Sequence, residues 1–337
     1  MWFEFGEDGL SVPTGPVTQV RLPVLPAITE PGAYNGTLYT VSEKLGSEFT
    51  VDPYMEGLNR NGVSWTAVYF GVEGNIGDNS VDFMKQVLAR YPGRIAAFYS
   101  TGIGGESEGQ AAGEKLTKQY TKAFEDIEKA IGSRAVAGIG EIEITAWPVS
   151  ANDPKVKDLI SFAAENSLVV MIHPKRGQLK EFGELIKAYP QTSFLMHHFR
   201  NDFTLERQQI LALMKEHNNL LYTIDADHLM FSDRDKIGLL YKYQETNQDE
   251  AVAGFVADFD FMFNELVTQS VQDYSPLVEV FPNRVMVGTE MSTDYNFAPP
   301  VYDRTIKILR HFIGKLPPEH QEAIAYKNAK HYLGPLE

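Results

Sequence analysis

The sequence predicts an α/β protein whose parallel strands close into a (β/α)8 barrel. The chain has 337 residues, a length that suits one large barrel or two ordinary domains. Short apolar runs alternate with amphipathic helical patterns along most of it. No glycine-rich phosphate-binding fingerprint follows the early strands, which favours a closed barrel over an open doubly wound sheet.

Seven runs have the length and the composition of buried strands. They are apolar almost throughout, which is typical of a parallel sheet that helices cover on its outer face. An Asn61-Gly62 turn precedes the first run, and Pro92-Gly93 precedes the second. The runs occupy residues 65–70, 95–99, 135–144, 168–173, 193–198, 220–225 and 284–289.

Helical patterns fill the intervals between these strands. Leu116, Tyr120 and Phe124 recur at helical spacing, and Gly132 stands where a helix would end. Asp153-Pro154 combines a capping residue with a proline at the first helical position. We expect helices over residues 79–91, 116–131, 153–166, 179–189, 204–217, 301–314 and 318–332, with a long helical insertion over 230–281.

The strand that should open the barrel is hard to place. Residues 17–25 are apolar, but prolines within and beside them would remove ladder donors that a central strand needs. Residues 1–5 have better strand chemistry and are very short. A third option is that the natural chain starts further upstream. We therefore expect one domain over 1–337, with an irregular segment over 1–60 and a barrel distorted or incomplete at strand one.

The composition excludes several classes of function. There are 30 basic and 45 acidic residues, and the net charge of −15 repels phosphate backbones, so we expect no nucleic-acid partner. No apolar run is long enough to span a bilayer, so we expect no membrane partner. No signal peptide is visible, which leaves a soluble protein that is cytoplasmic or exported with its leader removed.

The chain has no cysteine, so any metal must be held by His, Asp or Glu. All eight histidines stand at residue 173 or later. Imidazole and carboxylate ligands suit Zn²⁺, and they also bind Mn or Fe ions. Such an ion lowers the pKa of a bound water to about 7, and a nearby carboxylate can accept the proton.

Polar side chains recur where the later strands end. Active sites of (β/α)8 barrels lie at the C-terminal ends of the strands, so these residues are candidates for chemistry. Taken singly, each could be a solvated acid, a helix cap or a histidine bonded to a carbonyl. Their recurrence strand after strand favours a metal or acid–base site. The candidates are Glu141, Glu143, His173, His197, His198, Asp225, Asp227, His228 and Glu290.

The two adjacent histidines cannot both serve such a site. His197 and His198 follow one another on a strand, so their side chains point to opposite faces. At most one of them faces the barrel interior.

Several of these stretches resemble the amidohydrolase superfamily, specifically its amidohydrolase-2 branch. The resemblance covers about residues 60 to 334, and it depends on the order and spacing of the motifs. The resemblance implies a TIM-like barrel with one or two metal ions that hydrolyses C–N, C–O or P–O bonds, or decarboxylates in some members. The matching stretches are 138–143 (GIGEIE), 169–174 (VVMIHP), 190–198 (PQTSFLMHH), 283–290 (NRVMVGTE) and 325–334 (AYKNAKHYLG).

The resemblance assigns roles to four residues. His173 matches the strand-five metal ligand and His198 matches the strand-six histidine. Glu141 matches a strand-four position where some branches place a carboxylate or a modified lysine. Glu290 falls where the family has an aspartate that binds metal and shuttles the proton.

Two departures from the family pattern are clear. Glu290 is one methylene longer than that aspartate, and the strand-one His-x-His is absent because no histidine precedes His173. Three explanations stay open: strand one lies upstream of this chain, the site is rebuilt around Glu141, His173, His198 and Glu290 with Glu4 as a remote addition, or the barrel has lost its metal.

The sequence thus predicts a metal-dependent hydrolase of a small organic substrate, with one divalent ion that is Zn, Mn or Fe. Lys175, Arg200, Asp227 and His228 are the candidates for substrate binding. The alternatives are a metal-dependent decarboxylase of an aromatic acid and a non-catalytic binding barrel without metal. Association into a homo-oligomer stays open.

The insertion over 230–281 carries phenylalanines at 255, 259, 261 and 263. They could form an apolar lid over the site. Packing over the barrel or at a subunit interface is the explanation we favour.

Overall fold

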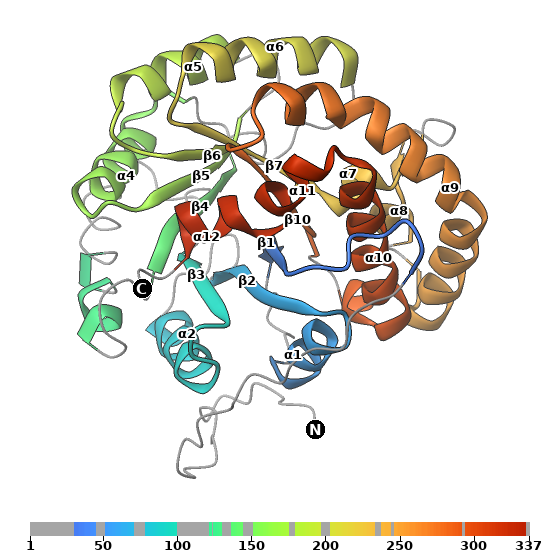
Figure 1. The fold of residues 1–337 in the computed structure, drawn as a ribbon. Coiled ribbons are helices and arrows are strands. Elements are labelled where there is room, and N and C mark those ends of the chain that lie inside the picture. The colour runs from blue at the N-terminus through green and yellow to red at the C-terminus, as the bar shows by residue number, and fades with distance from the viewer. Residues whose placement is uncertain are drawn as a thin grey trace.

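Eight parallel strands form a closed barrel in the order β1-β10-β7-β6-β5-β4-β3-β2, as Figure 1 shows. The computed structural model describes residues 30–44, 51–70, 78–99, 121–122, 124–129, 136–143, 151–174, 179–196, 203–232, 237–243, 246–291 and 294–334. The predicted (β/α)8 barrel is confirmed. Its strands are β1 (Leu38–Lys44), β2 (Val63–Phe70), β3 (Ile95–Tyr99), β4 (Val136–Glu143), β5 (Val169–His173), β6 (Phe194–Met196), β7 (Leu220–Asp225) and β10 (Val285–Gly288).

Helices follow most strands and surround the barrel (Figure 1). Residues 124–129 are also helical, within the helix predicted over 116–131. A two-stranded antiparallel hairpin, β8 (Phe231–Ser232) and β9 (Ile237–Gly238), lies after β7. The helices are α1 (Val51–Arg60), α2 (Asp78–Arg90), α4 (Pro154–Glu165), α5 (Leu179–Ala188), α6 (Phe203–Glu216), α7 (Ala226–Leu229), α8 (Leu239–Lys242), α9 (Gln248–Val280), α10 (Pro299–Lys315), α11 (Pro318–Glu322) and α12 (Asn328–Leu333), with a 3₁₀ turn η1 (Asp294–Phe297) and a π turn η2 (Ala323–Lys327).

The first strand corrects the sequence prediction. β1 pairs with β2 on one side and with β10 on the other, so the barrel closes within this chain. The expected irregular segment over 1–60 is therefore wrong for β1 and α1, while residues 1–29 lie outside the described part. The segment LYTVSEK escapes a search for apolar runs because it is polar at alternate positions and charged at its end. Pairing on both edges, and not its composition, makes it a central strand.

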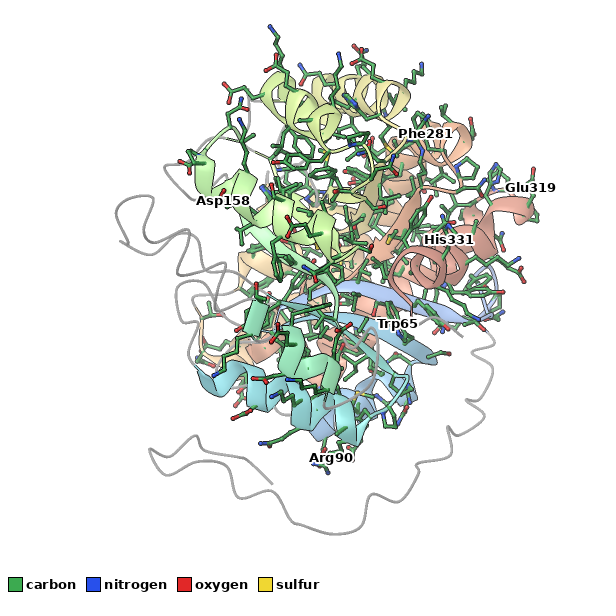
Figure 2. All side chains as sticks on the ribbon, turned by 90° about the vertical axis from the view of Figure 1, so that its left-hand side faces the viewer. Trp65, Arg90, Asp158, Phe281, Glu319 and His331 are labelled. Carbon is green, nitrogen blue, oxygen red and sulfur yellow. The ribbon has the colours of Figure 1, made fainter. Side chains whose placement is uncertain are left out.

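The barrel interior is filled by side chains that alternate along each strand. Trp65, Ala67 and Tyr69 of β2 belong to one buried cluster with residues from the other strands. In Figure 2, Trp65 lies within the barrel, whereas Arg90 of α2 lies at the outer surface. The interior is therefore a packed core, and not a channel. The other strand residues of this cluster are Val41, Ala96, Phe98, Val169, Met171, Leu195, Leu221 and Met286.

The C-terminal helix α12 closes the end of the barrel where the strands begin. Ala329 and Leu333 pack into the interior cluster. The Asn328 amide donates to the carbonyls of Pro282 and Val285, at 2.7 and 2.6 Å, next to the start of β10. Since this end is sealed, a site must use the opposite end, where the strands finish.

A buried arginine ties the start of β1 to α10. Arg310 is 3 % exposed, and burial lowers the pKa of its guanidinium to about 10. Its two terminal nitrogens donate to backbone carbonyls at 2.9–3.1 Å, and these carbonyls belong to the segments that lead into β1 and β2. The acceptors are Tyr34, Gly36, Asn61 and Gly62.

The long helix α9 forms most of the predicted insertion and packs beside α10 (Figure 1). Phe255 and Phe259 are fully buried and stack with their ring centroids 5.8 Å apart. Phe263 packs against Phe259 and the edge of His311. Phe261 alone points outward and is 84 % exposed. Three of the four phenylalanines thus serve packing.

A bulge in β4 sets which of its residues stands beside β5. The register shifts between Ile139 and Ile142, and Gly140 adopts φ 136°, which L side chains rarely adopt. A Cβ at this position would lie 2.4 Å from the Met171 carbonyl oxygen. Beyond the bulge, Glu143 and His173 are register partners at the ends of their strands.

Replacing Gly140 by alanine should destabilise the barrel strongly. The new Cβ meets both an unfavourable φ and the backbone of β5, so we expect a loss of about 3 kcal/mol or more. Gly93→Ala is the matched control, because Gly93 also has a positive φ but open space around it, and it should cost about 1 kcal/mol. Thermal unfolding followed by circular dichroism measures both. Equal losses would contradict the steric account.

Candidate functional site

The ends of two neighbouring strands bring the strongest candidates together. Asp225 ends β7 and is the register partner of Gly288, which ends β10. The chain after Asp225 turns at once into α7, which carries Asp227 and His228. Glu290 stands two residues after β10. The pairing of β7 with β10 therefore fixes the distance between the α7 residues and Glu290.

Asp227, His228 and Glu290 form a group that could hold a metal ion. One potential ligand atom from each residue lies within 4.8 Å of the other two. Asp227 and Glu290 are each 2 % exposed, and His228 is half-buried. Buried carboxylates are costly unless they are paired or coordinate a metal. Two oxygens and one nitrogen, with no sulfur, suit Zn²⁺ or Mn²⁺.

The donor set also fits a catalytic ion rather than a closed structural one. Catalytic zinc sites take three protein ligands and keep one position for water or substrate. The ligand atoms of a tetrahedral ion lie roughly 3.4 Å apart at the usual metal–ligand distances, so small side-chain movements would close the group around an ion. The residues present therefore fit the ion that the sequence predicts.

Two glycines make room for the carboxylates at this end of the barrel. A Cβ at position 288 would lie 2.1 Å from Oδ1 of Asp225 and 2.7 Å from the carbonyl oxygen of Val41. A Cβ at position 238, in β9, would lie 2.2 Å from Oδ1 of Asp227. Any other residue at either glycine would displace an acidic side chain of the site.

Two tyrosines contact the metal-binding candidates. The Tyr241 hydroxyl donates to Oε1 of Glu290 at 2.7 Å. The Tyr274 hydroxyl lies 3.1 Å from Nδ1 of His228. Burial raises the pKa of Tyr274 well above its usual value, and the neighbouring Tyr222 and then acids that include Asp225 raise it further. The Tyr274 hydroxyl therefore stays protonated at neutral pH.

Glu290 is held in an unusual backbone conformation. Its φ is 54°, in the left-handed region, and only one other non-glycine residue in the described part, Ser167, has a positive φ. This region costs a residue with a Cβ about 1 kcal/mol or more. The backbone amide of the preceding Thr289 donates to Val41 of β1 at 3.0 Å, so the chain turns directly after its last contact with β1.

The other predicted site residues have mixed outcomes. His173 ends β5, is 9 % exposed, and is separated from β7 by β6. Glu141 lies in β4 at the bulge, and its side chain lies outside the described part. Four predicted residues also lie outside the described part: Lys175, His197, His198 and Arg200. The structure therefore brings together Glu290, Asp227 and His228, the last two of which the sequence suggested for substrate binding.

The structure adds residues that the sequence argument missed or did not use. Glu43 stands near the end of β1, at the rim where the family pattern has its strand-one histidines, whereas Glu4 was the remote candidate from sequence. Glu143 is the residue paired with His173. Glu143 was already a strand-end candidate from the sequence, and the Gly-Ile-Gly bulge is the signal that favours it over Glu141 as the partner of His173. Tyr241 and Tyr274 have no such signal, because only the folded insertion brings them to the site.

Within the described residues, no helix combines the length and hydropathy that crossing a membrane requires.

Comparisons with known proteins extend the fold result. No family model matches the chain, and no curated protein matches it by sequence. Among solved structures, a probable 2-pyrone-4,6-dicarboxylic acid hydrolase from Acinetobacter baumannii has a TM-score of 0.54 at 12% identity, over 88% of this chain and 98% of that one. An amidohydrolase from Burkholderia multivorans has a TM-score of 0.54 at 11% identity, over 89% and 100% of the two chains.

A phosphotriesterase homology protein from Escherichia coli, solved with phosphate in its active site, has a TM-score of 0.52 at 12% identity. The match covers 90% of this chain and 99% of that chain. Identities this low establish the fold and leave the activity to the chemistry of the site. The chain has the (β/α)8-barrel fold of these amidohydrolase-type structures.

Proposed function

We propose that this chain is a metal-dependent hydrolase of a small organic substrate, built as an amidohydrolase-like barrel. One observation carries the proposal: the potential ligand atoms of Asp227, His228 and Glu290 converge at the end of the barrel where the strands finish. Chemistry in (β/α)8 barrels takes place at that end. The fold of the amidohydrolase-type neighbours supports the same reaction class.

In this proposal the ion is held by residues that directly follow β7 and β10. Asp227 and His228 bind it from α7, and Glu290 binds it or receives a proton beside it. A bound divalent ion would polarise the scissile bond and lower the pKa of a water molecule to about 7. Glu290 is suited to accept that proton because the Tyr241 hydrogen bond fixes one of its oxygens.

The roles of the remaining predicted residues are assigned from their places in the chain, and not from contacts with the candidate ligands. His173 ends β5 at the same rim, so we assign it to substrate polarisation. Glu141 and one of His197 and His198 stay candidates for a second set of ligands. Lys175 and Arg200 stay candidates for binding an anionic part of the substrate.

The backbone strain at Glu290 supports a functional role. A non-glycine residue in the left-handed region persists where the surrounding structure holds it there, and such residues gather at active sites. Glu290 is buried, accepts a hydrogen bond from Tyr241 and belongs to the group of potential ligands. A structural role alone would be met more cheaply by glycine or asparagine at this position.

Metal binding should depend on the three residues. We expect the purified chain to bind one equivalent of Zn²⁺ or Mn²⁺, and Asp227→Asn and Glu290→Gln to weaken the binding about 100-fold or more, because each removes a charged ligand. Isothermal titration calorimetry on metal-depleted protein measures this. Asp303→Asn, which alters only the contacts of Asp303 with Arg60 and Asn61 and none of the candidate ligands, is the control and should bind as wild type.

Absence of any affinity for Zn²⁺, Mn²⁺ or Fe²⁺ in the wild type would refute the proposal. It would favour the non-catalytic barrel instead.

The position of the ion can be tested separately. His173→Ala should keep the metal stoichiometry, because His173 ends a strand that is not adjacent to β7 or β10. Hydrolytic turnover should nevertheless fall, by about 10²-fold or more if His173 polarises the substrate. Elemental analysis of the purified variant gives the stoichiometry. If the purified His173→Ala protein contained no metal, the prediction would be wrong, and His173 would be a metal ligand as the family pattern implies.

Removing the strain at Glu290 should stabilise the protein while it abolishes activity. Glu290→Gly relieves the left-handed backbone and removes a buried carboxylate, so we expect a gain of about 1 kcal/mol in the free energy of unfolding. Ser167→Gly calibrates the strain alone, because Ser167 is exposed and has φ 55°. Urea unfolding of both variants gives the comparison. A clear destabilisation in Glu290→Gly alone would mean that the carboxylate supports the fold.

A further inference from the structure

The insertion between β7 and β10 contacts each of the three candidate ligands with a different element. β9 places Gly238 against the carboxylate of Asp227, α8 places Tyr241 on Glu290, and α9 places Tyr274 on His228. We propose that this insertion is the part of the fold that orients the ion's ligands, with Tyr241 and Tyr274 as positioning residues. The inference rests on the proposed metal site and goes beyond it by assigning a role to the insertion.

Tyr274 fixes which nitrogen of His228 can reach an ion. Its hydroxyl lies 3.1 Å from Nδ1, so in this proposal His228 coordinates the ion through Nε2. A neutral imidazole that binds a metal through Nε2 carries its proton on Nδ1. The Tyr274 oxygen can then accept a hydrogen bond from this Nδ1–H group. Tyr274 is itself fixed, because it is 2 % exposed and its ring packs edge-on against Phe312 at 6.2 Å.

A second contact joins α9 to the helix that carries His228. The Ser270 hydroxyl, one turn before Tyr274, shares its proton between two carbonyl oxygens, that of Leu266 within α9 at 2.6 Å and that of Leu229, the last residue of α7, at 3.1 Å. The ring orientation and the backbone of α7 are therefore both set by α9.

Tyr241 fixes the carboxylate on the other side of the group. Its hydrogen bond to Oε1 of Glu290 is 2.7 Å long, a distance typical of a charge-assisted bond. The short helix α8 that carries it is anchored at both ends. The Tyr295 hydroxyl bonds to the carbonyls of Leu239 and Leu240.

The C-terminal end of α8 is tied to α9 by a shared carboxylate. Lys242 and Tyr243 both donate to Oδ2 of Asp258, each at 2.6 Å. The two positioning tyrosines therefore sit on one connected unit, and a displacement of α8 relative to α9 would break these bonds. Simple packing over the barrel would not require both hydroxyls to meet atoms of the candidate ligands.

Removing the two hydroxyls tests the inference. Hydrogen bonds to metal ligands change metal affinity by about 10–100-fold, so Tyr241→Phe and Tyr274→Phe should each weaken Co²⁺ binding by that factor. The visible absorption spectrum of the bound Co²⁺ should also shift, because the ligands lose their fixed orientation. Phenylalanine keeps the ring packing, and circular dichroism confirms that each variant is folded.

Tyr54→Phe is the matched control. Tyr54 is 4 % exposed, and its hydroxyl donates to Thr66 at 3.1 Å, away from β7 and β10. This variant loses a buried hydroxyl of the same kind and should keep the wild-type affinity and the wild-type Co²⁺ spectrum.

The outcomes separate the two proposals. If the wild type binds Co²⁺ and both phenylalanine variants match it in affinity and spectrum, the positioning role is overturned and the metal site stands. If the wild type binds no Co²⁺, both fall together. A loss of affinity with Tyr54→Phe as large as with Tyr274→Phe would show a general effect of stability, which also overturns the positioning role.

Discussion

The close approach of three strands at Gly288 is the constraint on which the rim depends. β10 lies between β7 and β1, and the space where a side chain at 288 would stand is taken by the Asp225 carboxylate and the Val41 carbonyl. Only a residue without a Cβ lets β1 and β7 approach β10 this closely. Gly288 therefore has two effects. It permits the barrel to close between β1 and β10, and it leaves room for the buried Asp225 carboxylate just before the chain turns at Glu290.

This constraint connects distant parts of the chain. Val41 is the register partner of Gly288, and its carbonyl accepts from Thr289, so β1 determines where β10 ends. Arg310 in turn binds the carbonyls that lead into β1 and β2, which links α10 to the same closure. The left-handed turn at Glu290 follows immediately and is held by these contacts. The strain at that residue is thus balanced by interactions that are far away in sequence.

The other seven barrel strands could be predicted because a parallel strand covered on both faces has a continuous apolar sequence. β1 could not, since its burial comes from pairing with β2 and β10, and its own residues are half polar. For the site, the polar residues after β7 and β10 were predictable from their place at strand ends. Their grouping was not, because it depends on the immediate start of α7 and on the register of β7 with β10.

The arrangement also explains how the proposed site could work without histidines on strand one. In the family pattern, strand one supplies two imidazoles, whereas here the end of β1 carries Glu43. The insertion after β7 places β9 against Asp227, α8 against Glu290 and α9 against His228, and it brings two tyrosine hydroxyls to the group. Asp227 and Glu290 are buried, and His228 is half-buried. Burial strengthens the attraction of two carboxylates for a cation, because solvent no longer screens it. An ion between β7 and β10 would therefore gain from this enclosure what the strand-one histidines would otherwise provide.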